Sequence, residues 1–199
     1  RSTIDTDNRL WHGGFKQHDD ANTFRVGSLY RFENGVAPYV TYAQSFQPTN
    51  RLSASGKPFR PSRGELVEAG LKVQPDQWDA LLTAAGFNLT QADLLTADPH
   101  NAAFSIQAGE LRSRGLELEA RARLGAQWSV IAAYTWQNVE YTKGNPANIG
   151  KTPPRVPTRF GGVWLEWDAP SGLGAALGVR HNGGTWVGDG QLEQFRTAE

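Results

Sequence analysis

Apolar and polar residues alternate with a period of two along much of this chain. The alternation is clearest in residues 112–124. Its apolar positions are Leu116, Leu118, Ala120 and Ala122, and the positions between them are Glu117, Glu119, Arg121 and Arg123. Successive side chains of a β-strand point to opposite faces, so this segment predicts a strand with one apolar face and one charged face.

The following segment, residues 128–141, repeats this pattern. Its apolar face carries Trp128, Val130, Ala132, Tyr134 and Trp136, and Ile131 is the one exception on the other face. Residues 125–127 join the two segments as a tight hairpin turn. Six further strands are expected at 22–32, 36–46, 64–73, 79–90, 159–168 and 173–181.

The predicted connections alternate between short and long. Short turns are expected at 33–35, 74–77, 125–127 and 169–172, and long polar loops at 8–21, 47–63, 94–104 and 142–158. This rhythm is typical of an outer-membrane barrel, which has tight periplasmic turns and long extracellular loops. Strands of about 10–12 residues also cover the apolar band of such a barrel, about 25 Å tall. The fold class predicted is all-β, an antiparallel up-and-down transmembrane β-barrel.

Four tryptophans are placed where a membrane boundary is expected. Trp78, Trp128 and Trp167 lie beside short turns, and Trp136 lies toward the long-loop end. Tryptophan favours membrane–water interfaces because its ring is apolar and its N–H needs a polar partner. We expect these four to be membrane-interface aromatics. The alternative is that they are core tryptophans of a soluble protein.

Composition removes several classes of protein. No apolar run approaches the roughly 18–20 residues of a membrane helix, and the formal net charge of zero gives no basic footprint for nucleic acid. The absence of cysteine excludes disulfides and thiolate metal sites. No catalytic constellation is found, and the histidines are far apart. Glu117 and Glu119 share a face with Arg121 and Arg123, which suggests a lumen ladder of cross-strand charge pairs.

Four segments, in this order, resemble TonB-dependent siderophore receptors. They are YVTYAQSFQP at 39–48, KPFRPSRGE at 57–65 followed by EAGLK at 68–72, GELRSRGLELEA at 109–120, and NPANIGKTPPRVP at 145–157. The resemblance covers nearly the whole chain and is strongest to ferrichrome- and ferrioxamine-type receptors. It implies the C-terminal part of a barrel of about 22 strands with a plugged lumen. About eight meandering strands of so wide a barrel should form an open curved sheet.

The resemblance also implies a function and a location. Such receptors lie in the bacterial outer membrane, bind a ferric siderophore at the cell surface and import it with energy from the TonB complex. The partners expected are therefore a ferric siderophore, outer-membrane lipid and TonB. Because the chelate itself holds the iron, no cofactor and no protein metal ligand are expected. Candidate ligand contacts are the aromatic residues of the long-loop end, Phe46, Phe59, Phe104 and Tyr141.

The domain organisation expected is a partial barrel at 1–188 and an atypical tail at 189–199, without a plug domain. The chain has no methionine and no signal peptide at its start, so we expect it to be a fragment. Two other functions remain open: a passive outer-membrane porin or channel, and a soluble β-sandwich binding module. A barrel enzyme would need a Ser–His pair, and none is located.

Overall fold

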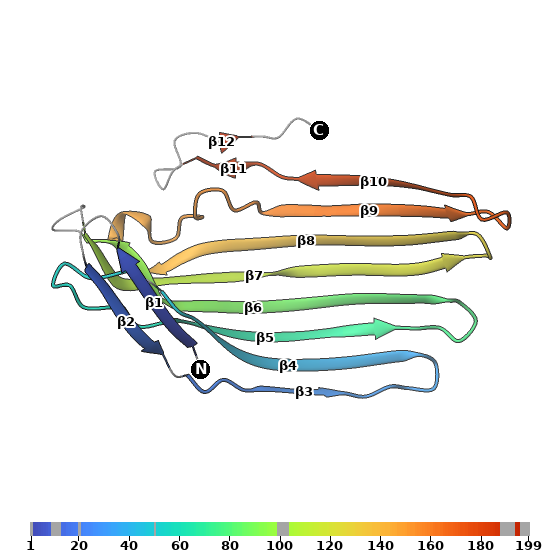
Figure 1. Cartoon of the computed structure of the whole chain (residues 1–199). Helices are drawn as coiled ribbons and strands as arrows, with labels where there is room; N and C mark the ends of the chain where they lie inside the picture. The colour runs from blue at the N-terminus through green and yellow to red at the C-terminus, as the bar shows by residue number, and fades with distance from the viewer. Residues whose placement is uncertain are drawn as a thin grey trace.

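The computed structural model describes residues 2–8, 13–19, 21–49, 51–98, 104–187 and 194–195. Its main feature is one eight-stranded antiparallel sheet in which every strand pairs with its neighbours in sequence, in the order β10-β9-β8-β7-β6-β5-β4-β3 (Figure 1). The strands are β3 (Arg25–Leu29), β4 (Val36–Gln47), β5 (Ser62–Val73), β6 (Ala80–Ala97), β7 (Ser105–Leu124), β8 (Trp128–Lys143), β9 (Arg159–Asp168) and β10 (Gly174–Asn182). The predicted all-β, eight-stranded open meander is confirmed.

Two small sheets accompany the large one. Strand β1 (Ser2–Asn8) pairs with β2 (Gly13–Asp19), and β11 (Thr185–Trp186) pairs with β12 (Gln194–Phe195). The predicted 8–21 loop is therefore wrong, because it contains β2. That strand has a single large apolar residue, Phe15, so no apolar face reveals it in the sequence. The described part of the chain contains no helix that is long and apolar enough to cross a membrane.

The predicted 94–104 loop is also wrong at its start. Strand β6 continues to Ala97, and β7 begins at Ser105 rather than at 112. The β6–β7 register shifts between Gln91 and Leu94 and again at Leu95, and Asp93 there has a φ of 60°. This β-bulge breaks the period of two, which hides the rest of the strand from a pattern search.

The first strand of the large sheet is shorter than the predicted strand at 22–32. Strand β3 covers only Arg25–Leu29. Backbone hydrogen bonds to β4 continue beyond both of its ends, from the Gln44 N–H to the Phe24 carbonyl (2.9 Å) and from the Tyr30 N–H to the Pro38 carbonyl (3.1 Å). The pairing of this segment with β4 therefore extends beyond both ends of β3.

The short and long connections lie at opposite ends of the sheet, as predicted (Figure 1). At the short-turn end, Gly35 has a φ of +80°, and a Cβ there would lie 2.1 Å from the Gln74 carbonyl oxygen. Only glycine fits this turn. The Gln74 N–H donates to the Gly35 carbonyl at 2.9 Å, and the Asp168 N–H donates to the Gln127 carbonyl at 2.8 Å. Neighbouring short turns thus support one another.

The described residues form almost no apolar core. Their buried hydrophobic residues are only Ala37, Phe59, Ala85 and Val139. Large apolar side chains lie exposed instead, with Leu177 at 68% and Leu118 at 54% exposure. A β-sandwich would bury such residues between two packed sheets. The strands of the large sheet pair in a single layer. This argues against a soluble β-sandwich and fits part of a barrel wall whose apolar face meets lipid.

Candidate functional site

The strand register sorts the side chains of the wall into two faces. Residues directly opposite one another in an antiparallel pair share a face. Leu118 lies between Ala84 of β6 and Tyr134 of β8, and Ala120 lies between Leu82 and Ala132. These positions belong to the apolar face, which we call the outward face. The alternate positions, including Glu117 and Glu119, belong to the inward face.

The predicted charge ladder is corrected on the inward face. Glu117, Glu119, Arg121 and Arg123 do share that face. However, the residues opposite Glu117 are Ala85 and Thr135, and those opposite Glu119 are Thr83 and Ala133. The register places small or uncharged residues beside these carboxylates, and a pattern read along one strand could not show this. The ion pairs recorded for the described residues are Arg31–Asp76, Arg112–Glu140 and Lys143–Glu110.

Aromatic side chains on the wall lie over glycines of the neighbouring strand. A Cβ added to Gly178 would lie 2.1 Å from the ring of Trp164, which is its direct partner in register. The same arrangement joins Tyr39 with Gly70, Phe87 with Gly115 and Tyr134 with Gly161. The glycines leave room for rings that lie against the sheet, an arrangement known to stabilise strands at glycine positions. The sequence predicted a strand at 173–181 but gave no sign that a ring packs on Gly178.

At the long-loop end, the Gln107 side chain holds the 48–61 loop against the β6–β7 hairpin. Its carbonyl oxygen accepts from the Arg60 N–H at 3.1 Å, and its amide nitrogen donates to the Arg60 carbonyl at 2.5 Å and to the Asp93 carbonyl at 2.9 Å. One side chain therefore satisfies backbone groups of two segments. No local sequence pattern predicts this role, because the contacts join residues far apart in the chain.

The 144–158 loop is fixed to the inward face in a similar way. Ser113 Oγ donates to Gln137 Oε1 at 3.1 Å, and Gln137 Nε2 donates to the Pro157 carbonyl at 2.9 Å. The Tyr141 N–H donates to the Lys151 carbonyl at 3.0 Å, and the Gly150 N–H donates to the Tyr141 carbonyl at 2.9 Å. Two of the long loops are thus held by side chains or backbone of the wall itself.

A third contact at this end involves Glu110. Lys143 Nζ donates to Glu110 Oε2 and Thr142 Oγ1 donates to Glu110 Oε1, each at 2.7 Å. Glu110 lies fourteen residues along β7 from Leu124 at the short-turn end. At a strand tilt of about 40° this is about 35 Å, which places Glu110 beyond an apolar band of about 25 Å. Hydrogen bonds from Lys143 and then from Thr142 lower the pKa of the Glu110 carboxyl below its ordinary value. The group is therefore a carboxylate at neutral pH.

The four candidate ligand contacts occupy different environments. Tyr141 alone is placed by the register on the inward face, opposite Leu111. Phe46 pairs with Arg63 in the outward set, Phe59 is buried in its loop at 9% exposure, and Phe104 is exposed just before β7. The structure therefore does not bring the four together. Their contact with a ligand stays a prediction, and the inward position favours Tyr141.

The four predicted interface tryptophans are all exposed or partly exposed. Trp128 and Trp167 are register partners at the short-turn end, with ring centroids 6.3 Å apart. Trp167 Nε1 donates to Gln127 Oε1 at 3.3 Å. Trp78 lies in the neighbouring turn region with 68% exposure, and Trp136 on the outward face near the other end with 52%. Three of the tryptophans thus lie at the short-turn end of the wall and one near its long-loop end. Their role at the membrane interface stays a prediction.

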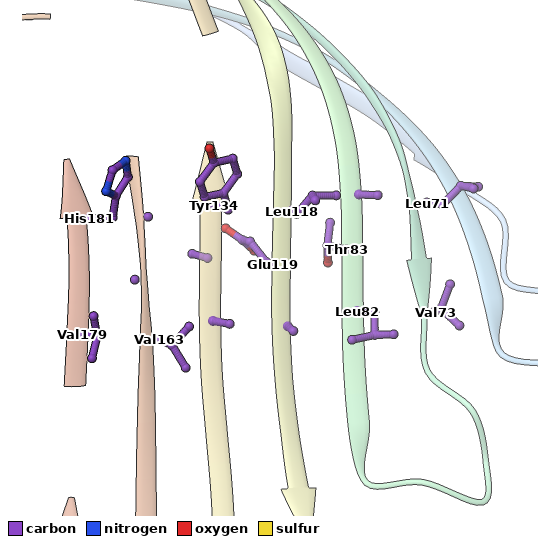
Figure 2. A pocket seen from close by; sticks show the side chains of 16 residues that line it. Leu71, Val73, Leu82, Thr83, Leu118, Glu119, Tyr134, Val163, Val179 and His181 are labelled. Carbon is purple, nitrogen blue, oxygen red and sulfur yellow. The ribbon is translucent and has the colours of Figure 1, made fainter. Parts of the chain in front are cut away.

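A shallow apolar hollow lies on the outward face. Its larger side chains come from neighbouring strands and include Leu71, Leu82, Leu118, Val163 and Val179 (Figure 2). The small residues Ala84, Ala120, Ala132 and Gly161 leave the space between them. An apolar hollow on this face suits hydrocarbon rather than a polar chelate.

No metal cluster is found where the chain is described: no group of three or more His, Asp or Glu side chains could hold an ion there. His181 lies on β10, opposite Gly161. His12 and His100 lie outside the described residues.

Comparison with known proteins identifies the wall. The family model for the TonB dependent receptor-like β-barrel matches residues 1–198. The chain is 38% identical to the ferrichrome outer membrane transporter/phage receptor of Escherichia coli K12, over 86% of this chain and 23% of that protein. It is 35% identical to the ferrioxamine receptor of Yersinia enterocolitica, over 86% of this chain and 24% of that protein.

A solved structure has the same fold. The siderophore receptor PiuA from Acinetobacter baumannii aligns with a TM-score of 0.76 at 19% identity, over 95% of this chain and 30% of that one. The chain thus spans about a quarter of the length of the curated relatives named here. The sheet order, the apolar outward face and these matches agree, and the chain belongs to the TonB-dependent receptor β-barrel family of the bacterial outer membrane.

Proposed function

We propose that this chain is the barrel wall of an outer-membrane receptor that imports ferric siderophores with energy from TonB. The observation that carries the proposal is the 38% identity to a ferrichrome transporter over 86% of this chain. An inward face that carries charged residues such as Glu68, Glu117 and Arg121, with loops held in place at the extracellular end, is compatible with a solute entering from outside. In this proposal the iron is held by its chelate, and the described residues of the wall contain no cluster of metal ligands.

The test is uptake by living cells. The native gene is expressed in a Gram-negative host that lacks its own ferric siderophore receptors, under iron limitation. Ferrichrome and ferrioxamine B are then supplied in turn as the sole iron source, with radioactive iron as the label. We expect uptake of at least one of them above the empty-vector level. Equal uptake with and without the gene for every ferric hydroxamate tested would reject the proposal for this ligand class.

A passive channel is the competing function, and energy dependence separates the two. A TonB-dependent receptor should lose uptake in a tonB deletion host, while a porin should continue to admit solutes down their gradient. Outer-membrane abundance measured in both hosts controls for expression. Uptake that persists without TonB would favour the porin.

Within the wall, we propose that Tyr141 is the contact among the four aromatic candidates, because only its position is inward. Tyr141→Ala should raise the siderophore concentration needed for half-maximal uptake. The matched control is Phe46→Ala, on the outward face, which should leave that concentration unchanged. The reverse result would place the ligand elsewhere.

A further inference from the structure

The two long loops that are fixed to the wall carry positive charge only. Neither the 48–61 loop nor the 144–158 loop contains an aspartate or a glutamate. Their basic residues, which we call the loop cations, are Arg51, Lys57 and Arg60 in the first loop and Lys151 and Arg155 in the second. So uniform a sign over two loops that are far apart in the sequence indicates a common role.

The short turns have the opposite charge. The turns at 33–35, 74–77, 125–127 and 169–172 contain Glu33 and Asp76 and no lysine or arginine. Long and short connections lie at opposite ends of the sheet (Figure 1). The charge of these loops and turns therefore changes sign from the extracellular end of the wall to its other end.

The loop cations have no ion-pair partner among the described residues. The ion pairs recorded at this end join Lys143 to Glu110 and Arg112 to Glu140, so both of these carboxylates already have a cation. All of the loop cations except Lys151, which is partly exposed, are exposed. Exposed charges act on solutes over roughly a Debye length, about 8 Å at physiological ionic strength. A cluster of one sign raises the local concentration of solutes of the other sign.

The wall holds the backbone beside two of the loop cations. The N–H and the carbonyl of Arg60 are both bonded to the Gln107 side chain. The Arg155 N–H donates to the Trp186 carbonyl at 2.9 Å. Arg155 has a φ of 62°, which a residue with a side chain rarely adopts and which persists where surrounding contacts determine it. These two side chains therefore extend from fixed points of the wall.

The 144–158 loop also contacts the residue proposed to touch the ligand. Its Gly150 N–H donates to the Tyr141 carbonyl, and its Lys151 carbonyl accepts from the Tyr141 N–H. The two loops are rooted on β5 and β8, which are three strand spacings apart, about 14 Å along the sheet. The loops that carry the cations thus flank β6 and β7, at the same end of the wall as Tyr141.

We propose that the loop cations select ferric chelates of net negative charge over neutral or cationic chelates of the same kind. This inference rests on the proposed siderophore transport and adds the charge class of the ligand. Carboxylates of a chelate that are not bound to iron accept charge-assisted hydrogen bonds from guanidinium and ammonium groups. Glu33 and Asp76 at the short-turn end repel the same ligand, so the selection takes place on capture from outside.

The test presents one iron chelate at three charges. Ferrioxamine B has a free amine and is cationic, its N-acetyl derivative is neutral, and its N-succinyl derivative is anionic, while the groups that bind iron stay the same. Binding to the full-length native receptor in lipid-depleted dodecyl maltoside micelles is followed by quenching of tryptophan fluorescence. At low salt we expect the succinyl derivative to bind about tenfold more tightly than ferrioxamine B, from a few exposed charge contacts of ordinary strength. High salt should reduce this difference.

Two matched variants locate the charge preference. Arg60→Gln with Arg155→Gln removes one cation from each loop and should weaken binding of the succinyl derivative about fivefold. Binding of the neutral derivative should stay unchanged, which also shows that the variant is folded. The control, Arg31→Gln with Arg123→Gln, removes two exposed arginines near the short-turn end and should bind all three derivatives like the wild type.

Several results would overturn the charge selection. They are equal affinity of the wild type for the three derivatives, tighter binding of the cationic one, no binding of any of them, and equal losses in the loop variant and its control. Uptake of the radioactive iron complexes distinguishes this failure from that of the proposed function. Uptake without a charge preference would remove the charge class and leave siderophore transport in place. Absence of uptake for every ferric hydroxamate would reject transport and the charge class together.

Discussion

The two faces of this single-layer wall are built from neighbouring residues but follow opposite rules. On the outward face, apolar side chains such as Leu118 and Leu177 are exposed, and small residues leave a hollow. On the inward face, one residue away, Glu117 and Glu119 alternate with them. A soluble protein would bury the first set and expose the second. The difference shows that environment, rather than burial within the chain, accounts for the apolar positions.

The largest expected effect comes from placing a charge on the outward face. Leu118→Arg would put a cation in the apolar band, and we expect a loss of about 2–4 kcal/mol in the free energy of unfolding. The measurement is urea unfolding of the native protein in lipid vesicles. Its matched control is Glu119→Arg, one residue further on the inward face, where the same side chain meets a polar environment. Equal losses at the two positions would contradict the assignment of faces.

The next effect tests the aromatic–glycine pairs. Gly178→Ala would force its Cβ to 2.1 Å from the Trp164 ring. Displacing that ring should cost about 1–3 kcal/mol of unfolding free energy, which is typical of overpacking. Gly86→Ala is the control, because a Cβ there would lie 3.7 Å from the nearest side-chain atom, of Leu116. The urea midpoint of unfolding is measured for both variants. A Gly178→Ala midpoint at or above that of Gly86→Ala would disprove the close contact between Gly178 and the Trp164 ring.

A smaller effect is expected at the loop end. Gln107→Ala removes the hydrogen bonds to Arg60 and Asp93, and we expect the 48–61 loop to open at a cost of about 1–2 kcal/mol. Hydrogen exchange of the loop amides should rise in the variant while that of β7 stays unchanged. Gln47→Ala, at an exposed residue of β4, serves as the control. Unchanged hydrogen exchange at the Arg60 amide would show that Gln107 does not hold the loop in place.

The smallest effect is the pH dependence of Glu110. Its pKa is lowered in the folded protein, so its contribution is present above the unfolded pKa and is lost as pH falls through the folded value. Lys143 is 69% exposed, so solvent screening should limit the loss in Glu110→Gln to below about 1 kcal/mol at neutral pH. The difference between variant and wild type should vanish under acid conditions, as followed by thermal unfolding. A difference that persists in strong acid would point to packing instead.

Most of the fold could be predicted from the chain, and the failures have physical causes. Alternation located most strands of the large sheet, because the period of two is local, and the spacing of the flanking turns located the strand at 64–73. It failed after Gln91, where the β6 bulge breaks the period, and at β2, which has too few apolar residues to show a face. The candidate site was predicted less well. Aromatic residues near the loops were identified, but not which of them face inward.

The limit is set by register. Which residues of one strand share a face follows from the chain alone, as does the short and long rhythm of the connections. Which residues of two strands meet depends on how far one strand slides along the other, and no local pattern contains that offset. Only the tertiary structure therefore placed Trp164 over Gly178 and Gln107 beside Arg60. It also placed small residues, rather than the expected cross-strand charge partners, opposite Glu117 and Glu119.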